Sequence, residues 1–130
     1  MRYKNFEELP IWQKAREIVK LIYSLTSGND ELKKDYRFIG QLRAAGLSIM
    51  NNIAEGFDSD NVKEFKRFLM YAQRSASEVM SMTYVLIDAY KIKDGPRELY
   101  EMVLEERRQL KGFIKYLNSL KSTKSQKATN

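Results

Sequence analysis

Residues 65–90 read FKRFLMYAQRSASEVMSMTYVLIDAY, and this stretch decides the fold class. Its apolar residues recur at steps of three and four, so they share one face of an α-helix. Asn61 and Glu64 have the spacing of a capping box, and we therefore predict a long helix from there to about Tyr90. Its main face carries Phe65, Phe68, Leu69, Ala72, Ala76, Val79, Thr83, Leu86 and Tyr90. A weaker apolar strip lies opposite, with Tyr71, Met82, Val85 and Ala89.

The same periodicity predicts three further helices, over residues 10–26, 36–57 and 96–120. Pro10 and Pro96 suit first helical positions. The helix over 36–57 has an apolar arc wider than one face, which is typical of a helix buried on more than one side. Short breaks between the helices favour antiparallel neighbours, so we predict an all-α, up-down-up-down four-helix bundle over residues 1–120. The polar residues 121–130 lack apolar anchors, and we predict a disordered basic tail there.

The composition excludes several kinds of chemistry. The 130 residues contain no cysteine and no histidine, which removes disulfides, thiolate nucleophiles, the commonest general base and the commonest metal ligand. We therefore predict a protein that is not an enzyme and holds neither metal nor cofactor. The N-terminus lacks the apolar core of a signal peptide, and no apolar run approaches the ~20 residues of a membrane span. We expect a soluble, cytoplasmic protein that does not enter a membrane.

The basic residues gather near the C-terminus. The net charge is +6, and from Arg107 to the end the chain has cations and no acid. Such a surface attracts phosphate through counterion release, without reading sequence. No interleaved aromatic pattern suggests base stacking, so the expected binding is non-specific. The alternative is an ordinary solvated helix face with a solubilising tail. The candidate residues are Arg107, Arg108, Lys111, Lys115, Lys121, Lys124 and Lys127.

Polar residues also follow one side of the helix over 36–57. Spaced at three and four residues, they suggest a seam that hydrogen-bonds a neighbouring helix or subunit and fixes its register; a functional groove is the alternative. We expect Asn52 and Glu55 to be substantially buried. Lone buried charges are costly, so Arg43 is expected to pair with Glu78 or Glu106, within or between subunits. The residues along this side of the helix are Gln41, Ser48, Asn52 and Glu55. Together with Arg43 on the apolar arc of the same helix, and Glu78 and Glu106 on the two following helices, they make up the predicted polar seam.

Several blocks of the chain resemble a known family. They read FEELPIWQKA (residues 6–15), QLRAAGLSI (41–49), NIAEGF (52–57) and FKRFL (65–69), followed by Ala72, Ser75 and Glu78. Together they resemble the four-helix-bundle proteins encoded in intervening sequences of bacterial 23S rRNA genes. That family is similar to the accessory variability proteins of diversity-generating retroelements. One departure concerns Ala44, which follows Arg43 where many relatives carry a second arginine.

The resemblance implies a bundle that assembles into a homopentameric barrel. For the retroelement relatives it also implies a basic body that binds nucleic acid, RNA or DNA, and a reverse transcriptase. Three hypotheses follow for this chain. The first is a homo-oligomeric nucleic-acid-binding module, and the second is a structural adaptor for a protein partner, with the charge incidental. The third is a magnesium-dependent nuclease of rRNA processing, using Glu55, Glu78 and Asp88.

Overall fold

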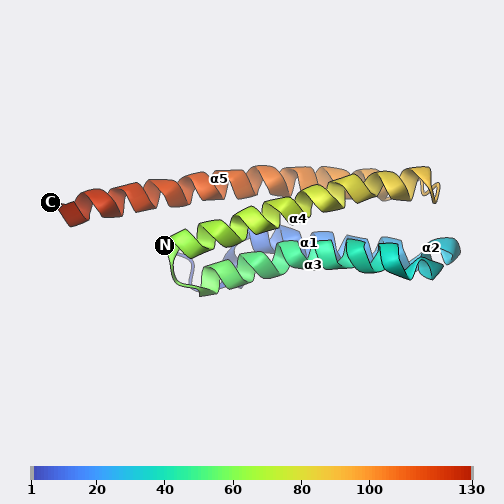
Figure 1. The fold of residues 1–130 in the computed structure, drawn as a ribbon, viewed down its shortest axis with the longest axis horizontal. Helices are drawn as coiled ribbons and strands as arrows, with labels where there is room; N and C mark the ends of the chain where they lie inside the picture. The colour runs from blue at the N-terminus through green and yellow to red at the C-terminus, as the bar shows by residue number, and fades with distance from the viewer. Residues whose placement is uncertain (1, 130) are drawn as a thin grey trace.

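The computed structural model describes the backbone of residues 2–129 and the side chains of residues 2–120. Within that part of the chain every regular element is a helix: η1 (Phe6–Glu8), α1 (Pro10–Ser27), α2 (Asp30–Lys34), α3 (Tyr36–Asp58), α4 (Val62–Asp88) and α5 (Pro96–Thr129). The four long helices run alternately in opposite directions (Figure 1). Helices α1 and α4 each pack against both α3 and α5. The predicted all-α, up-down-up-down bundle is therefore confirmed.

Local capping interactions explain where the helices begin. Helix α1 starts at Pro10, as predicted. The side chain of Asn29 accepts a hydrogen bond from Leu32 N at 2.8 Å and starts α2, while Asn61 accepts one from Glu64 N at 2.9 Å and starts α4. The predicted capping box is only half closed, because the Glu64 carboxylate instead binds Arg67 at 2.6 Å. These side chains satisfy backbone donors that the first helical turn leaves without partners.

One polar contact joins two helices at the end of the bundle that holds α2. The Asp35 carboxylate caps α3 by accepting from Phe38 N at 3.1 Å. Its other oxygen accepts a hydrogen bond from the Tyr90 hydroxyl, which follows α4. The Tyr90 bond, with the Phe38 bond second, lowers the pKa of Asp35, because both stabilise the ionised carboxylate. Tyr90, which the sequence pattern placed on the main apolar face of the long helix, therefore also holds the side chain that caps α3.

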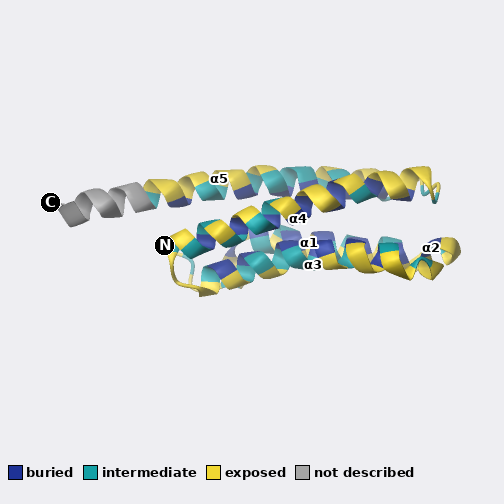
Figure 2. Ribbon diagram, viewed as in Figure 1, coloured by how far each residue is buried: buried dark blue, intermediate teal, exposed yellow. Residues whose placement is uncertain are grey.

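The apolar faces predicted from sequence meet in one core along the axis of the bundle. Figure 2 shows the buried positions on the inward sides of the helices. At about 25 cal/mol for each Å² of apolar surface removed from water, this burial is the main stabilising contribution. The fully buried large side chains are Leu9, Ile18, Ile22, Leu32, Leu42, Ile49, Ile53, Leu69, Leu86, Leu99, Leu110 and Leu117.

The single chain leaves part of the second apolar side uncovered. On α3, Leu47, Met50 and Ala54 are only half-buried. On α4, Val85 is 37% exposed, and Ala89, directly after the helix, is also exposed. The two helices with wide apolar arcs thus retain apolar residues at the surface of the isolated bundle.

The C-terminal boundary of the bundle was predicted at Leu120. Helix α5 extends to Thr129, so its backbone continues past that point. The side chains of residues 121–130 lie outside the described part of the structure. The predicted disordered tail falls on those residues and stays a prediction.

At Gly56, α3 packs tightly against α4. A Cβ atom at this position would lie 2.8 Å from both Phe65 Cδ1 and Phe68 Cβ, which is shorter than a van der Waals contact. Gly112 in α5 has open space around the corresponding position. Both glycines lie inside helices, but only Gly56 is needed for packing.

Replacing these two glycines is expected to change stability in opposite directions. We expect Gly56→Ala to lower the free energy of unfolding by about 1–3 kcal/mol, because the added methyl group forces α4 away. The control Gly112→Ala should raise it by about 0.5–1 kcal/mol through helix propensity alone. Urea denaturation followed by circular dichroism measures both. Equal shifts of the same sign would contradict the close packing at Gly56.

Candidate nucleic-acid interface

Three of the predicted cations form an exposed stripe on α5. Arg108, Lys111 and Lys115 are exposed, and their spacing of three and four residues places them on one face of the helix. Arg108 contacts Glu105 at 3.7 Å, with side chains 68% and 46% exposed. Surface pairs of this kind contribute at most about 1 kcal/mol, so a phosphate can compete for the guanidinium. We call Arg108, Lys111 and Lys115 the α5 stripe.

Arg107 is less exposed than the residues of the α5 stripe. It is half-buried, and its Nη1 lies 3.7 Å from Met80 Sδ on α4. Its buried Nε has no hydrogen-bond partner. The reason is geometric, since one residue along a helix turns the side chain by about 100°. Arg107 therefore packs between α4 and α5 as a half-buried side chain, and its part in binding nucleic acid stays a prediction.

The other three predicted cations follow Leu120 in the sequence. Lys121, Lys124 and Lys127 lie outside the residues whose side chains the structure describes. They follow the α5 stripe in the sequence and remain predicted contributors to the basic surface.

Part of the predicted polar seam exists as a hydrogen-bonded contact between α3 and α4. The Ser75 hydroxyl donates to Ser48 Oγ at 2.8 Å, and Asn52 Nδ2 donates to Ser48 O at 2.8 Å and to Ser48 Oγ at 2.9 Å. Gln41, Ser48, Ser75 and Glu78 line one shallow groove of about 250 Å³ between the two helices. The seam prediction missed Ser75, although a small polar residue beside Ala76 on the main apolar face is a usable signal.

The predicted burial of the seam is wrong in the single chain. Glu55 is exposed and Asn52 is only half-buried. Asn52 directs its amide back to Ser48, one turn earlier on its own helix, and not to another helix. Glu55 lies in the last turns of α3, where it reaches solvent. Gln41 and Glu78 are exposed as well.

The expected ion pair of Arg43 is also wrong within the chain. Arg43 Nε donates to Thr26 Oγ1 at 2.9 Å, and its Nη2 lies 3.3 Å from Ser27 Oγ. The guanidinium carbon lies 4.4 Å from the centre of the Tyr23 ring, within the range of a cation–π contact. Arg43 faces the C-terminal turn of α1, on a different side of α3 from Ser48. Hydroxyls and a ring therefore stabilise the charge where a carboxylate was predicted.

Glu106 is buried in the core without a partner. Its side chain is 0% exposed, and neither carboxylate oxygen accepts a hydrogen bond. Burial raises the pKa of Glu106 to about 8, because the charged form is poorly solvated there, and Lys14 opposes this only in part. At neutral pH the group is therefore mainly protonated. Glu106 thus lies on the inward face of α5, and within the chain it does not pair with Arg43.

Two further features, metal-binding clusters and membrane-spanning helices, can be sought among the described residues. No group of three or more acidic side chains among residues 2–120 is arranged to hold a metal ion; this includes Glu55, Glu78 and Asp88, the set considered for magnesium. No helix in the described part of the chain is long and apolar enough to cross a membrane.

Comparisons with known proteins address the identity of the chain. A search of curated proteins finds no match. The family model described as 23S rRNA-intervening sequence protein matches residues 7–112. This range covers well over half of the chain, includes the blocks on which the resemblance was based except for Phe6, and ends inside α5. The chain belongs to the 23S rRNA-intervening sequence protein family.

Proposed function

We propose that this protein is a non-enzymatic homo-oligomer, most simply a pentamer, that binds nucleic acid non-specifically through a basic surface. The α5 stripe carries the proposal, because Arg108, Lys111 and Lys115 are exposed on one face and no acid follows Glu106 in the sequence. Charges in this arrangement bind phosphates by releasing counterions.

Self-association is supported by the apolar residues that α3 and α4 leave at the surface. Leu47, Met50 and Ala54 on α3 and Val85 on α4 would be covered by another copy of the chain. A ring of copies would bring several α5 stripes into one field, which increases the attraction for a polyanion. The resemblance to proteins that form a homopentameric barrel points to five copies.

Binding to unrelated nucleic acids tests the proposal directly. Two single-stranded RNAs and two double-stranded DNAs of unrelated sequence should bind with similar affinity within each class, measured by fluorescence anisotropy. Three phosphate contacts give a slope of log affinity against log salt of about −2 for single strands, and pooled stripes give a steeper slope. A strong preference for one sequence, or no binding at low salt, would contradict non-specific backbone binding.

The adaptor hypothesis makes a different prediction for the same protein. An adaptor whose charge is incidental would bind its protein partner after nuclease treatment and would ignore free polyanions. The two functions are therefore separated by the anisotropy measurement.

A further inference from the structure

Apolar side chains are exposed where α4 ends and α5 begins. Tyr84 is 54% exposed and Ile87 is 41% exposed, both in the last turns of α4. Buried positions on the same helix are filled by Thr83 and Leu86, so the exposed pair is not needed for the core of the bundle. Large exposed apolar residues grouped beside a cavity are typical of an interaction surface.

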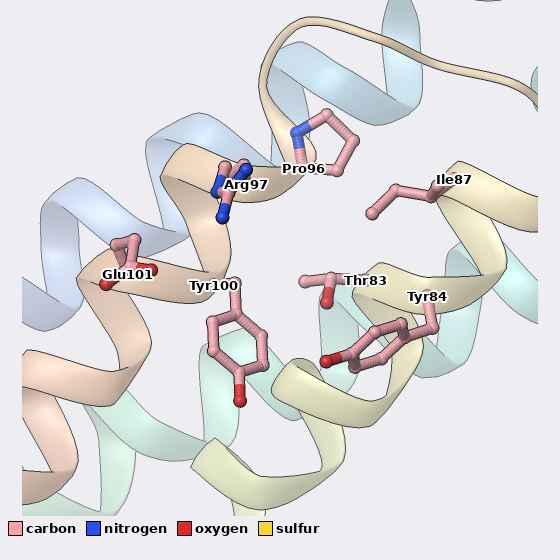
Figure 3. Close-up of a pocket in the computed structure, with 7 residues that line it drawn as sticks. All are labelled: Thr83, Tyr84, Ile87, Pro96, Arg97, Tyr100 and Glu101. Carbon is pink, nitrogen blue, oxygen red and sulfur yellow. The ribbon is translucent and has the colours of Figure 1, made fainter.

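The first cavity at this place has a volume of about 220 Å³. Figure 3 shows Thr83, Tyr84 and Ile87 from α4 on one side, and Pro96, Arg97, Tyr100 and Glu101 from α5 on the other. The Tyr84 and Tyr100 rings lie 5.9 Å apart, edge to face. A volume of this size suits one large side chain of a partner.

A second cavity adjoins the first and adds positive charge. Its volume is about 440 Å³, and it is lined by Ile87, Lys91, Ile92, Lys93 and Arg97. Ile87 and Arg97 line both cavities, so the two form one continuous depression. We call it the α4–α5 groove. Its apolar lining is bordered by three cations and by one carboxylate, that of Glu101.

The backbone of Lys91 is unusual in a way that favours a role in binding. Its φ is +55°, in the left-handed region that glycine adopts without cost and other residues adopt rarely. The turn after α4 is closed by Ile92 N, which donates to Leu86 O at 3.1 Å, a helix end where glycine is the common residue. The chain has a lysine in this position, and that lysine lines the groove.

We propose that the α4–α5 groove binds an acidic segment of a partner protein that inserts one large apolar side chain. The inserted side chain would contact Tyr84, Ile87 and Tyr100, and the carboxylates flanking it would approach Lys91, Lys93 and Arg97. A segment with this pattern matches both the apolar lining and the excess of positive charge. Nucleic acid fits less well, because the two tyrosine rings lie edge to face and do not form a parallel pair between which a base could stack.

The groove is separate from the proposed nucleic-acid surface. Arg97 precedes the α5 stripe by 11 to 18 residues of the same helix, which corresponds to roughly 16–27 Å at 1.5 Å per residue. The proposal therefore adds a second binding function, and it stands or fails independently of the stripe.

The test uses the full-length protein and a defined probe. The probe is a fluorescein-labelled peptide with one tryptophan between two runs of three glutamates, and its control has serine in place of the tryptophan. A single-stranded oligonucleotide of equal charge is the third ligand. We expect the tryptophan peptide to bind most tightly of the three, as measured by fluorescence anisotropy on the full-length variant with glutamine at all three positions of the α5 stripe, which removes the proposed nucleic-acid surface and keeps the groove.

Matched variants locate the binding site. The double variant Lys91→Gly and Lys93→Gln removes two groove cations and relieves the backbone of residue 91, so its free energy of unfolding should equal or exceed that of the wild type. It should bind the peptide about fivefold or more weakly, as expected for the loss of two surface charge contacts. The control Lys20→Gln and Lys63→Gln removes the same charge elsewhere and should bind normally, as should a variant with glutamine at all three positions of the α5 stripe.

Three outcomes would overturn the proposal. Equal binding of the tryptophan and serine peptides would show that no apolar side chain is inserted. Equal weakening by the groove and control variants would show that only net charge matters. Tighter binding of the oligonucleotide, lost in the groove variant, would assign the groove to nucleic acid.

Discussion

Raising the pH from below 4.5 to above 8 is expected to destabilise the folded protein by on the order of 5 kcal/mol through Glu106 alone. The carboxyl is buried without a hydrogen-bond partner. Its pKa in the folded state is therefore about 8, whereas the pKa of an ordinary glutamate is 4.5. Below 4.5 both states are protonated and the contribution is fully present. As the pH rises, the unfolded state loses its proton first, so stability falls until the folded carboxyl also ionises.

The variant Glu106→Gln isolates this effect. Glutamine keeps the size and polarity of the neutral side chain but does not titrate, so its stability should match that of the wild type at low pH. Near pH 7 it should already be more stable by on the order of 3 kcal/mol, and the difference should level off above about pH 8. Urea denaturation at a series of pH values measures both proteins. Parallel curves would mean that the pKa of Glu106 is the same in the folded and unfolded states.

A second substitution separates charge from polarity at the same position. Glu106→Leu removes the two oxygens that lack partners and fills the space with apolar atoms. We expect it to be more stable than Glu106→Gln at every pH, by about 1–3 kcal/mol, because no polar group is left unsatisfied in the core. If it is less stable, the cavity around residue 106 is hydrated and the carboxyl has water as a partner.

Reversing the charges of the α5 stripe is expected to weaken nucleic-acid binding on the order of a hundredfold, at about 1 kcal/mol for each lost phosphate contact. The variant replaces Arg108, Lys111 and Lys115 by glutamate. Because all three side chains are exposed, the fold should persist. Loss of affinity is measured with single-stranded RNA at low salt, and circular dichroism checks the helices.

The matched control reverses three other exposed cations, Lys20 on α1, Lys34 on α2 and Lys63 on α4. It has the same net charge as the stripe variant and should lose much less affinity. If the two triple variants lose affinity equally, the whole charge of the protein attracts the polyanion and the α5 stripe has no special role.

The helices could be predicted from sequence because their signals are local. Pro10 and the Asn61 cap fix two helix starts, and the spacing of Phe65, Leu69 and Ala72 identifies the buried face of α4. These features depend on residues within a few turns of each other, so periodicity and capping chemistry suffice.

The partners of the polar residues could not be predicted in the same way. Arg43 binds Thr26 on another helix, and the choice between this hydroxyl and a distant carboxylate depends on how α3 is rotated against α1. Arg107 and Arg108 are adjacent in sequence, yet one packs on Met80 and the other faces solvent. Successive side chains on a helix point about 100° apart. An error in the predicted rotation of the helix therefore changes which of the two arginines is expected to be buried.

The α4–α5 groove depends on three-dimensional arrangement for the same reason. Lys91 and Arg97 lie on either side of a turn, and only the path of that turn brings them to one depression with Ile87. The sequence marks the turn by Gly95 and Pro96. It does not show that the side chain of Lys91 lines a cavity.

Sedimentation velocity at micromolar concentration tests most directly whether α3 and α4 carry more apolar surface than one chain can cover. The chain has a mass of 15.3 kDa. The proposed assembly predicts one sharp boundary at a multiple of this mass, five for the barrel implied by the resemblance. A single stable species of one chain, unchanged as concentration rises, would contradict the self-association from which the pooled basic surface follows.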